Sequence, residues 1–235
     1  MSQGKGSKLH LWLGNNGYDK PVHRKRLKPL SLPVLGIDLD GVIADSYRSW
    51  LPLLNQQFGT SYAEVTDLHF EKLFPVPTDW IETYFYSHFE ALFALPSPMS
   101  DARRSLTVLR HFSKVILLTT RRQVEAPVTY AWLKKWRIPY DAIVFTEGQP
   151  KGPIASKFAV VAAIDDDPEQ IVSLRASGIN TLLFDAPYNR SFCSPRTLRV
   201  RDWHQATTLF ALRQLPPATS RHRQWYMIPT KKRTE

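Results

Sequence analysis

Two aspartates, Asp38 and Asp40, are the side chains in this sequence that are best placed by type and spacing to do chemistry. They follow the apolar run from Val34 to Ile37 and precede Gly41, a pattern that predicts a buried strand with a sharp exit. Residues i and i+2 of a strand share a face, so both carboxylates should project from the strand's carboxyl end, where open α/β sheets bind ligands. The alternative is an acidic turn whose aspartates bond their own backbone.

Two carboxylates at such close range raise each other's pKa unless a cation or a proton lies between them. Magnesium, which prefers oxygen ligands, can supply the cation. One carboxylate can then attack phosphorus while the other transfers protons, which is the aspartyl-phosphate route to phosphoryl transfer. In this interpretation Asp38 is the nucleophile, and Asp40 protonates the leaving oxygen and later deprotonates the attacking water.

Two further apolar runs end in polar residues that suit such a site. Residues 115–118 precede Thr119, and residues 162–164 precede Asp165 and Asp166. The alternation of helical and extended segments between these runs predicts right-handed crossovers and a parallel sheet. The side chains that follow the runs should therefore meet the first aspartate pair at one edge of the sheet.

These segments resemble, in the right order, the motifs of the haloacid dehalogenase (HAD) superfamily of phosphotransferases. The resemblance rests on the segments DLDGVIAD from Asp38, TTR from Thr119, a following lysine, and AAIDDDP ending at Pro168. The later segments FDAPYNR and VRDW are similar to the end of its 5'(3')-deoxyribonucleotidase-like branch. The resemblance covers about residues 34–205.

The resemblance implies a magnesium site and a phosphate-binding hydroxyl. Asp165 and Asp166 are expected to complete a site for Mg²⁺ together with Asp38 and Asp40, because hard cations prefer carboxylate oxygens. Thr119 is expected to donate a hydrogen bond to an equatorial phosphoryl oxygen, where negative charge must be stabilised as the bond breaks.

A lysine should add a positive charge at the same place. Lys151 precedes a Gly-Pro pair at the start of a predicted helix, and Lys157 lies at the end of that helix. A side chain at the loop end of the helix reaches the strand ends better, so we favour Lys151 over Lys157. Thr120, Arg121 and Asn189 are candidates for contacts with the substrate, each with ordinary surface polarity as the alternative.

The predicted fold is α/β, a Rossmann-like parallel sheet with helices on both faces and a small helical cap inserted after the first strand. The cap carries an aromatic cluster that is typical of packing between helices, namely Tyr84, Phe85, Tyr86, Phe89 and Phe93. In HAD enzymes a cap at this place closes over the site and sets substrate choice, so the resemblance also implies a lid.

The predicted organisation has four parts, listed here by residue range: a basic N-terminal extension, 1–31; a phosphatase core, 32–45 and 99–215; the helical cap, 46–98; and a basic C-terminal tail, 216–235. The net charge of +10 lies wholly in the two ends, which carry +6 and +4, so residues 32–215 are neutral. Short basic tails bind polyanions loosely but are more often solvated extensions, and we favour the latter over nucleic-acid binding.

Composition bounds the class of protein. A chain of 235 residues with 43% hydrophobic residues can bury a full core. No apolar stretch approaches the roughly 18 residues that a membrane span needs. The single cysteine, Cys193, excludes an internal disulfide, and the first residues lack the apolar centre of a secretory signal, so we expect a cytoplasmic protein.

The sequence thus predicts a Mg²⁺-dependent phosphomonoester hydrolase whose substrate is small, with a nucleoside monophosphate the first choice because of the resemblance. Two alternatives stay open. One is a phosphatase that processes nucleic-acid ends held by the basic tails, and the other is a catalytically idle binding module of the same fold. The oligomeric state is not indicated by the sequence.

Overall fold

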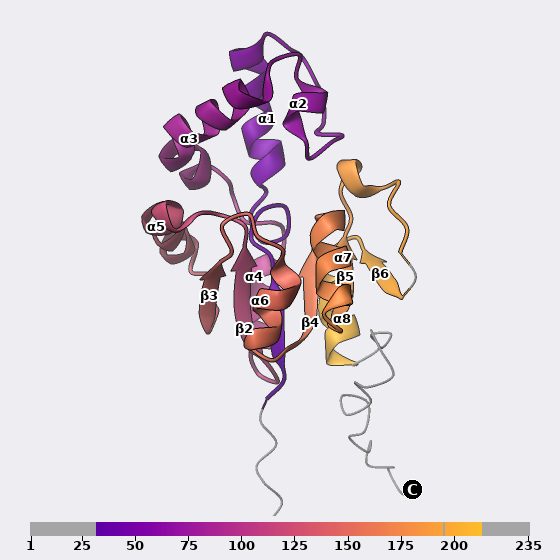
Figure 1. Cartoon of the computed structure of the whole chain (residues 1–235). Coiled ribbons are helices and arrows are strands. Elements are labelled where there is room, and N and C mark those ends of the chain that lie inside the picture. The colour runs from indigo at the N-terminus through magenta and orange to yellow at the C-terminus, as the bar shows by residue number, and fades with distance from the viewer. Residues whose placement is uncertain (1–31, 195, 213–235) are drawn as a thin grey trace, which may run out of the picture. The chain divides into compact units, whose positions relative to one another are not determined.

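A six-stranded parallel sheet forms the centre of the molecule, seen in Figure 1 in a computed structural model that describes residues 32–194 and 196–212. The strands, in the sheet order β3-β2-β1-β4-β5-β6, have these bounds: β1 Val34–Ile37, β2 Lys114–Thr119, β3 Ala142–Phe145, β4 Val160–Asp165, β5 Asn180–Phe184 and β6 Thr197–Val200. All neighbouring strands run parallel. The two basic ends lie outside the described residues, so the expectation about them stays a prediction.

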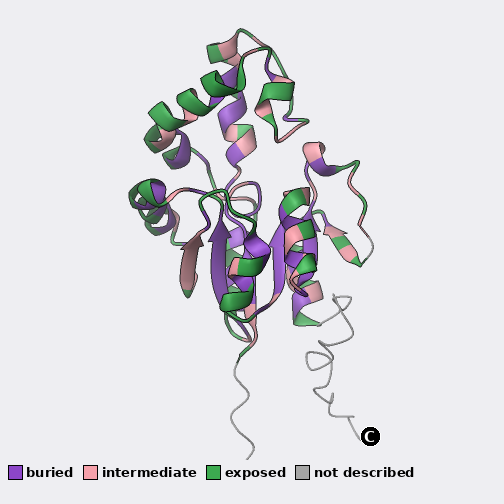
Figure 2. Ribbon diagram, in the orientation of Figure 1, coloured by how far each residue is buried: buried purple, intermediate pink, exposed green. Residues whose placement is uncertain are grey.

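Helices cover both faces of this sheet, as predicted. One apolar cluster joins Leu106, Trp132 and Phe210 to one face, and another joins Ala155 and Leu174 to the other. The helices concerned are α4 (Ala102–Leu109), α5 (Ala126–Trp136) and α8 (Trp203–Ala211) on the first face, with α6 (Lys151–Lys157) and α7 (Pro168–Ala176) on the second. Figure 2 shows the middle strands buried between them, which explains their continuous runs of apolar residues.

Strand register brings the polar residues Asp38, Thr119 and Asp165 to one edge of the sheet. Ile37, the last residue of β1, pairs with Leu117 of β2 and with Ile164 of β4. Thr119 and Asp165 therefore end their strands beside the turn that follows β1. That edge is the carboxyl edge of the sheet, where the sequence predicts the site.

The segment between β1 and α4 forms a separate helical layer with a core of its own. Its helices are α1 (Ser46–Phe58), α2 (Phe70–Leu73) and α3 (Thr78–Ala94). Its buried side chains include Trp50, Leu54 and Phe74, and aromatic rings surround them. The expectation of core packing is confirmed for Phe93, which is buried, and Tyr84, Phe85 and Phe89 pack against the same cluster. It is wrong for Tyr86, which is exposed.

The cap joins the core through two adjacent backbone segments. Ala44 and Pro98 form an isolated antiparallel bridge, the Asp45 amide donates to the Ser97 carbonyl at 2.9 Å, and the Met99 amide donates to the Ile43 carbonyl at 2.8 Å. The predicted cap range, 46–98, stays a prediction.

The last two elements, β6 and α8, are not predicted by the sequence pattern. Asp202 accepts a hydrogen bond from the Gln205 amide and caps α8. Trp203 is fully buried, and its indole nitrogen donates to the Val42 carbonyl at 2.8 Å, so the helix supports the turn after β1. Two short 3-10 helices, Gln123–Glu125 and Pro187–Asn189, complete the fold. Within the described ranges, no helix is both long and apolar enough to cross a bilayer.

Candidate active site

Asp38 and Lys151 form a buried ion pair at the carboxyl edge of the sheet. The lysine Nζ lies 2.5 Å from Asp38 Oδ1 and 2.7 Å from Asp165 Oδ2, and all three side chains are buried. Burial disfavours the lysine charge, but the carboxylates of Asp165 and Asp38 outweigh it and raise the pKa of Lys151 above its ordinary value. Lys151 therefore presents a fixed positive charge beside Asp38.

The start of α6 positions that lysine. The backbone amide of Lys151 donates to Gln170 Oε1 of α7 at 2.8 Å. The next residue, Gly152, lies so close to α7 that an added Cβ would be 2.1 Å from the Ser173 carbonyl oxygen. Lys157, the alternative candidate, lies at the other end of α6 and is exposed. The geometry places Lys151 against the carboxylates and leaves Lys157 away from them.

Three carboxylates, which we call the acid cluster, converge beside this lysine: Asp38, Asp165 and Asp166. One oxygen from each lies within 4.8 Å of the others. Burial raises the pKa of Asp165 to about 7; the Lys151 ammonium opposes this rise and Asp38 adds to it. Burial also raises the pKa of Asp166 well above its ordinary value, and the carboxylates of Asp38 and Asp165 raise it further. The hydrogen bond from Tyr188 and the Lys151 ammonium oppose this rise.

The acid cluster fits a small hard cation. Oxygen ligands of Mg²⁺ lie about 2.1 Å from the ion, so two of them are about 3 to 4 Å apart. The oxygens of the acid cluster, all within 4.8 Å of one another, are close enough to reach one such ion after small adjustments. The donor set consists only of carboxylate oxygens, the type that Mg²⁺ prefers, and the buried negative charge exceeds what Lys151 neutralises.

Asp166 is held by the turn that follows β1 and by the loop that follows β5. The Tyr188 hydroxyl donates to Asp166 Oδ2, and Gly41 lies directly against the same carboxylate. Asn189 donates its side-chain amide to the Asp166 carbonyl and to the Phe184 carbonyl, at 2.8 Å each. Asn189 is fully buried, with its carbonyl oxygen accepting from the Ala186 amide and from Arg199. The predicted substrate contact is not supported by this placement, and Asn189 instead positions the backbone of the acid cluster.

Asp40 lies in the turn beyond β1, and its carboxylate is outside the acid cluster. It accepts two hydrogen bonds from Arg121, from Nε to Oδ2 at 2.8 Å and from Nη2 to Oδ1 at 2.7 Å, and a third from the Ser46 hydroxyl. Because β1 ends at Ile37, strand alternation does not extend to Asp40, and its side chain follows the turn instead. The structure therefore does not bring this carboxylate to the predicted metal position.

The two threonines after β2 differ in exposure. Thr119 is buried at the strand end and its hydroxyl accepts from the Arg121 amide at 3.2 Å, whereas Thr120 is exposed. Arg121, predicted to contact substrate, is only 4% exposed and donates to Asp40 and Thr129. Its internal bonding leaves Thr120 as the more accessible candidate for a substrate contact.

The sequence does not indicate the roles of four residues of the site. These residues contact side chains that were predicted, and tertiary packing brings them there: Ser46, Phe93, Thr129 and Tyr188. Tyr188 lies inside the FDAPYNR segment, so that segment was a usable pointer to its position but not to its role.

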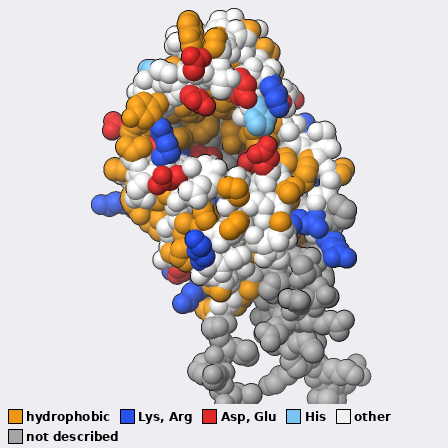
Figure 3. All heavy atoms as spheres, in the orientation of Figure 1, with side chains coloured by type: hydrophobic (Ala, Val, Ile, Leu, Met, Phe, Trp, Pro, Cys, Tyr) orange, Lys and Arg blue, Asp and Glu red, His pale blue; other side chains and the backbone are white. Residues whose placement is uncertain are grey.

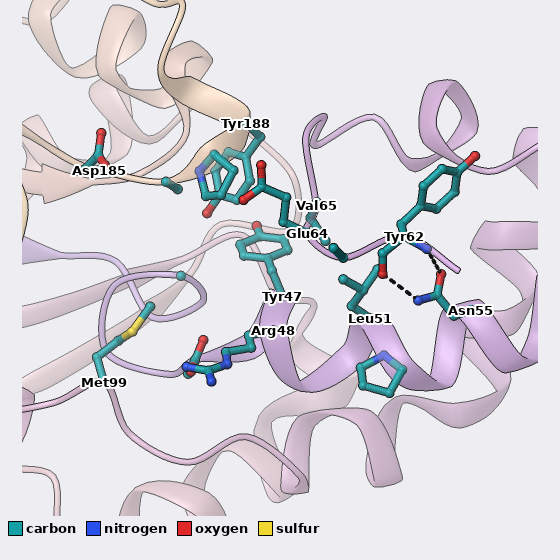
Figure 4. A pocket seen from close by; sticks show the side chains of 16 residues that line it. Tyr47, Arg48, Leu51, Asn55, Tyr62, Glu64, Val65, Met99, Asp185 and Tyr188 are labelled. Carbon is teal, nitrogen blue, oxygen red and sulfur yellow. Dashed lines mark hydrogen bonds between the residues drawn. The ribbon is translucent and has the colours of Figure 1, made fainter. Parts of the chain in front are cut away.

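A hollow opens between the cap and the core on the face shown in Figure 3, with hydrophobic and acidic side chains on its border. A cavity of about 560 Å³ lies beside α1 and the Tyr188 loop (Figure 4). Tyr47 and Tyr188 line it and contact each other edge to face, with ring centroids 5.0 Å apart. Its lining includes Gly41 but not Asp38, Thr119, Lys151 or Asp165.

The parallel sheet, the inserted cap and the acid cluster beside a buried lysine define a phosphatase-class hydrolase of the HAD superfamily. A family model described as "5' nucleotidase, deoxy (Pyrimidine), cytosolic type C protein" matches residues 32–215, and the chain belongs to this family.

Two proteins named as nucleotidases are similar in sequence. A nucleotidase of Clostridium acetobutylicum is 28% identical over 171 residues, which are 72% of this chain and 88% of that protein. YqfW of Bacillus subtilis, whose nucleotidase name is provisional, is 30% identical over 182 residues, 73% of this chain and 90% of that protein.

Solved structures share the fold. A HAD-superfamily hydrolase of Geobacter sulfurreducens superposes with a TM-score of 0.51 at 16% identity, covering 76% of this chain and 96% of that one. A haloacid dehalogenase-like protein of Streptococcus pneumoniae gives a TM-score of 0.55 at 13% identity, covering 76% and 98%. At such identities the likeness establishes the α/β fold alone, as the sequence predicts.

Proposed function

We propose that this enzyme is a Mg²⁺-dependent phosphomonoester hydrolase that forms an aspartyl-phosphate at Asp38 and acts on a nucleoside monophosphate. The observation that carries the proposal is the buried contact between Lys151 Nζ and Asp38 Oδ1 beside two further carboxylates. It combines a nucleophile, a fixed positive charge and oxygen ligands for a cation at one place. Asp38, Asp165 and Asp166 would hold Mg²⁺, which when bound neutralises charge on the phosphoryl oxygens.

The first half-reaction transfers the phosphoryl group to the enzyme. A carboxylate oxygen of Asp38 forms a bond to phosphorus as the bond from phosphorus to the ester oxygen breaks. Asp40, in its protonated form, gives its proton to that oxygen, which leaves as the alcohol of the nucleoside. Lys151 keeps its positive charge next to Asp38 and stabilises the negative charge on the transferring group.

The second half-reaction releases phosphate. Asp40, now a carboxylate, takes a proton from water, and the water oxygen attacks phosphorus while the bond to Asp38 breaks. Inorganic phosphate leaves, Asp38 is a carboxylate again, and Asp40 is protonated for the next cycle. Thr119 would donate a hydrogen bond from its hydroxyl to a phosphoryl oxygen in both halves, since its position at the end of β2 is next to the turn that carries Asp38.

The substrate class follows from the family rather than from the geometry. The family model is described by deoxy 5'-nucleotidase activity and both similar proteins carry nucleotidase names, which supports a nucleoside monophosphate. Of the candidate contacts, Thr120 is exposed, and the hollow between cap and core offers room for a base. A cytoplasmic location is part of the proposal, supported by the single cysteine.

Asp38→Asn tests the proposal. We expect it to abolish turnover of p-nitrophenyl phosphate and of deoxynucleoside monophosphates, with and without Mg²⁺, while leaving the unfolding temperature close to that of the wild type. Rapid-quench capture of a phosphorylated wild-type enzyme, missing in Asp38→Asn, identifies the nucleophile. Wild-type turnover by Asp38→Asn would eliminate the covalent mechanism.

The substrate panel separates the alternatives. It contains deoxynucleoside and ribonucleoside monophosphates, sugar phosphates, and short oligonucleotides phosphorylated at the 5' or 3' end. Highest kcat/KM for a deoxynucleoside monophosphate supports the proposal. Preference for an oligonucleotide, falling steeply as salt rises, would favour end processing instead.

A further inference from the structure

Arg121 binds the carboxylate of Asp40 with a geometry that fixes both side chains. Its Nε and Nη2 atoms contact the two Asp40 oxygens at 2.8 and 2.7 Å, a bidentate arrangement that only an arginine can make. The Arg121 side chain is 2% exposed and that of Asp40 14% exposed. Solvent therefore does little to screen or displace this contact.

The guanidinium is itself anchored on two further sides. Its third nitrogen, Nη1, donates to Thr129 Oγ1 in α5 at 2.9 Å, and Thr129 donates in turn to the Glu125 carbonyl at 2.8 Å. The ring of Phe93, from α3 of the cap, lies 4.0 Å from the guanidinium carbon. All three nitrogens of Arg121 and one face of its plane are thus engaged by protein groups.

The contacts leave Asp40 with a restricted set of orientations. A carboxylate has about four lone-pair positions, and three are used here: Oδ1 accepts from Arg121 and from Ser46, and Oδ2 accepts from Arg121. The remaining position is on Oδ2. Proton transfer to a leaving oxygen requires a donor held at a defined distance and angle, so the group that sets this position sets the rate.

We propose that Arg121 is a positioning residue that aims Oδ2 of Asp40 at the leaving-group oxygen, and that Phe93 makes this aim depend on the cap. The inference rests on the proposed function, because it assigns a role to the acid of that reaction. Arg121 acts through Asp40 and does not contact the substrate. This positioning role takes the place of the substrate contact that the sequence suggests for Arg121.

Leaving-group dependence tests the proposal. The ratio kcat/KM reports the steps up to the first irreversible one, which here is expulsion of the leaving oxygen. p-Nitrophenolate leaves as a stable anion and needs little protonation, whereas phenolate needs more and a nucleoside alkoxide needs it most. In Arg121→Met, which keeps the stem beside Phe93, we expect kcat/KM to fall about 100-fold for the nucleotide and only a few-fold for p-nitrophenyl phosphate.

Arg110→Met is the matched control. Arg110 also binds an aspartate through two nitrogens, with Asp141 Oδ1 at 2.6 Å from Nη2, but it lies at the opposite end of the sheet, next to the start of β2. We expect its leaving-group dependence to equal that of the wild type. An equal fall in kcat/KM for all three esters in Arg121→Met would overturn the proposal, since loss of a purely structural contact lowers kcat/KM for every substrate alike.

Two further variants keep the test decisive. If Arg121→Met does not fold, Arg121→Lys keeps the charge without the bidentate geometry and should show the same selective loss. Phe93→Leu removes the ring face, and we expect a smaller but equally selective loss; an unchanged profile would overturn the link to the cap. Asp38→Asn separates the two proposals. If Asp38→Asn were fully active, the covalent mechanism would be wrong. If Asp38→Asn were inactive but Arg121→Met kept the leaving-group dependence of the wild type, only the role inferred for Arg121 would be wrong.

Discussion

Gly41 and the carboxylate of Asp166 are in such close contact that no side chain fits between them. A Cβ atom added at Gly41 would lie 2.0 Å from Asp166 Oδ2, and the backbone at Gly41 has φ +81°, a conformation that favours glycine. We expect Gly41→Ala to displace Asp166 and to abolish both Mg²⁺ binding and phosphatase activity. Isothermal titration with Mg²⁺ and a p-nitrophenyl phosphate assay measure the two losses.

Gly59→Ala is the control for backbone strain alone. Gly59 ends α1 with φ +66° and has nothing within 4 Å of an added Cβ. Its replacement should lower the free energy of unfolding by about 1 kcal/mol and leave Mg²⁺ binding intact. Equal behaviour of the two variants would mean that the contact with Asp166 has no functional role.

Lys151→Met should separate charge balance from packing. The substitution leaves Asp38 and Asp165 buried without their shared cation, and breaking such a buried pair costs roughly 3–5 kcal/mol. We expect a large drop in unfolding temperature without Mg²⁺, a partial recovery with Mg²⁺, and kcat at least about 100-fold lower. Differential scanning calorimetry with and without Mg²⁺ measures the recovery.

Lys157→Met tests the less favoured alternative in the same helix. Because Lys157 is exposed at the end of α6, its replacement should leave both kcat and the unfolding temperature near wild-type values. A loss of activity comparable to that of Lys151→Met would show that Lys157 supplies the positive charge.

Tyr188→Phe should weaken the metal site without removing a ligand. The Tyr188 hydroxyl donates to Asp166 Oδ2, and loss of such an outer hydrogen bond lowers metal affinity about 10–100-fold. Tyr47→Phe is the matched control, because the described part of the chain offers the Tyr47 hydroxyl no hydrogen-bond partner while its ring contacts Tyr188. Titration calorimetry should therefore show weaker Mg²⁺ binding in the first variant and unchanged binding in the second.

Asp141 should make stability depend on pH in the acid range. Its hydrogen bonds from Arg110, with a further one from the Val115 amide, lower the pKa of Asp141 below its ordinary value, although burial opposes the shift. A lowered pKa means that the stabilisation is fully present above the ordinary value and is lost as pH falls through the folded-state value. Arg110 is more than a third exposed, so solvent limits the effect to about 1 kcal/mol.

Denaturant unfolding of Asp141→Asn at several pH values measures this effect. The variant should be less stable than wild type at pH 7, and the gap should close as pH falls below about 4. A gap that stays constant down to pH 2 would indicate that hydrogen-bond geometry, and not the carboxylate charge, accounts for the difference.

The position of the site could be predicted because strand ends are a local property of the sequence. Apolar runs that stop at Asp38, Thr119 and Asp165 require only that the strands be parallel for those residues to meet. The position of Lys151 could be predicted for a similar reason, since a helix that follows a parallel strand begins at the same edge of the sheet. These predictions needed no knowledge of side-chain torsions.

The partners of the predicted residues could not be found in this way. Asp40 points to Arg121 and not to the acid cluster, because a turn follows β1 and the direction of its side chain depends on a residue 81 positions later. Asn189 has the polarity of a substrate contact, yet tertiary packing buries it beneath Asp166. Both roles stay predictions, because side-chain direction, and not strand position, decides them.

The bridge between Ala44 and Pro98 has a consequence for how new specificities can arise. It fixes the two ends of the inserted segment side by side, so the core closes that loop whatever the loop contains. The entropy cost of a longer or shorter insertion grows only slowly with length, by about 0.6 kcal/mol per doubling. The length of the cap can therefore change at these two residues while β1 keeps its pairing, but a replacement cap would have to supply the contacts that Ser46 makes with Asp40 and Phe93 makes with Arg121.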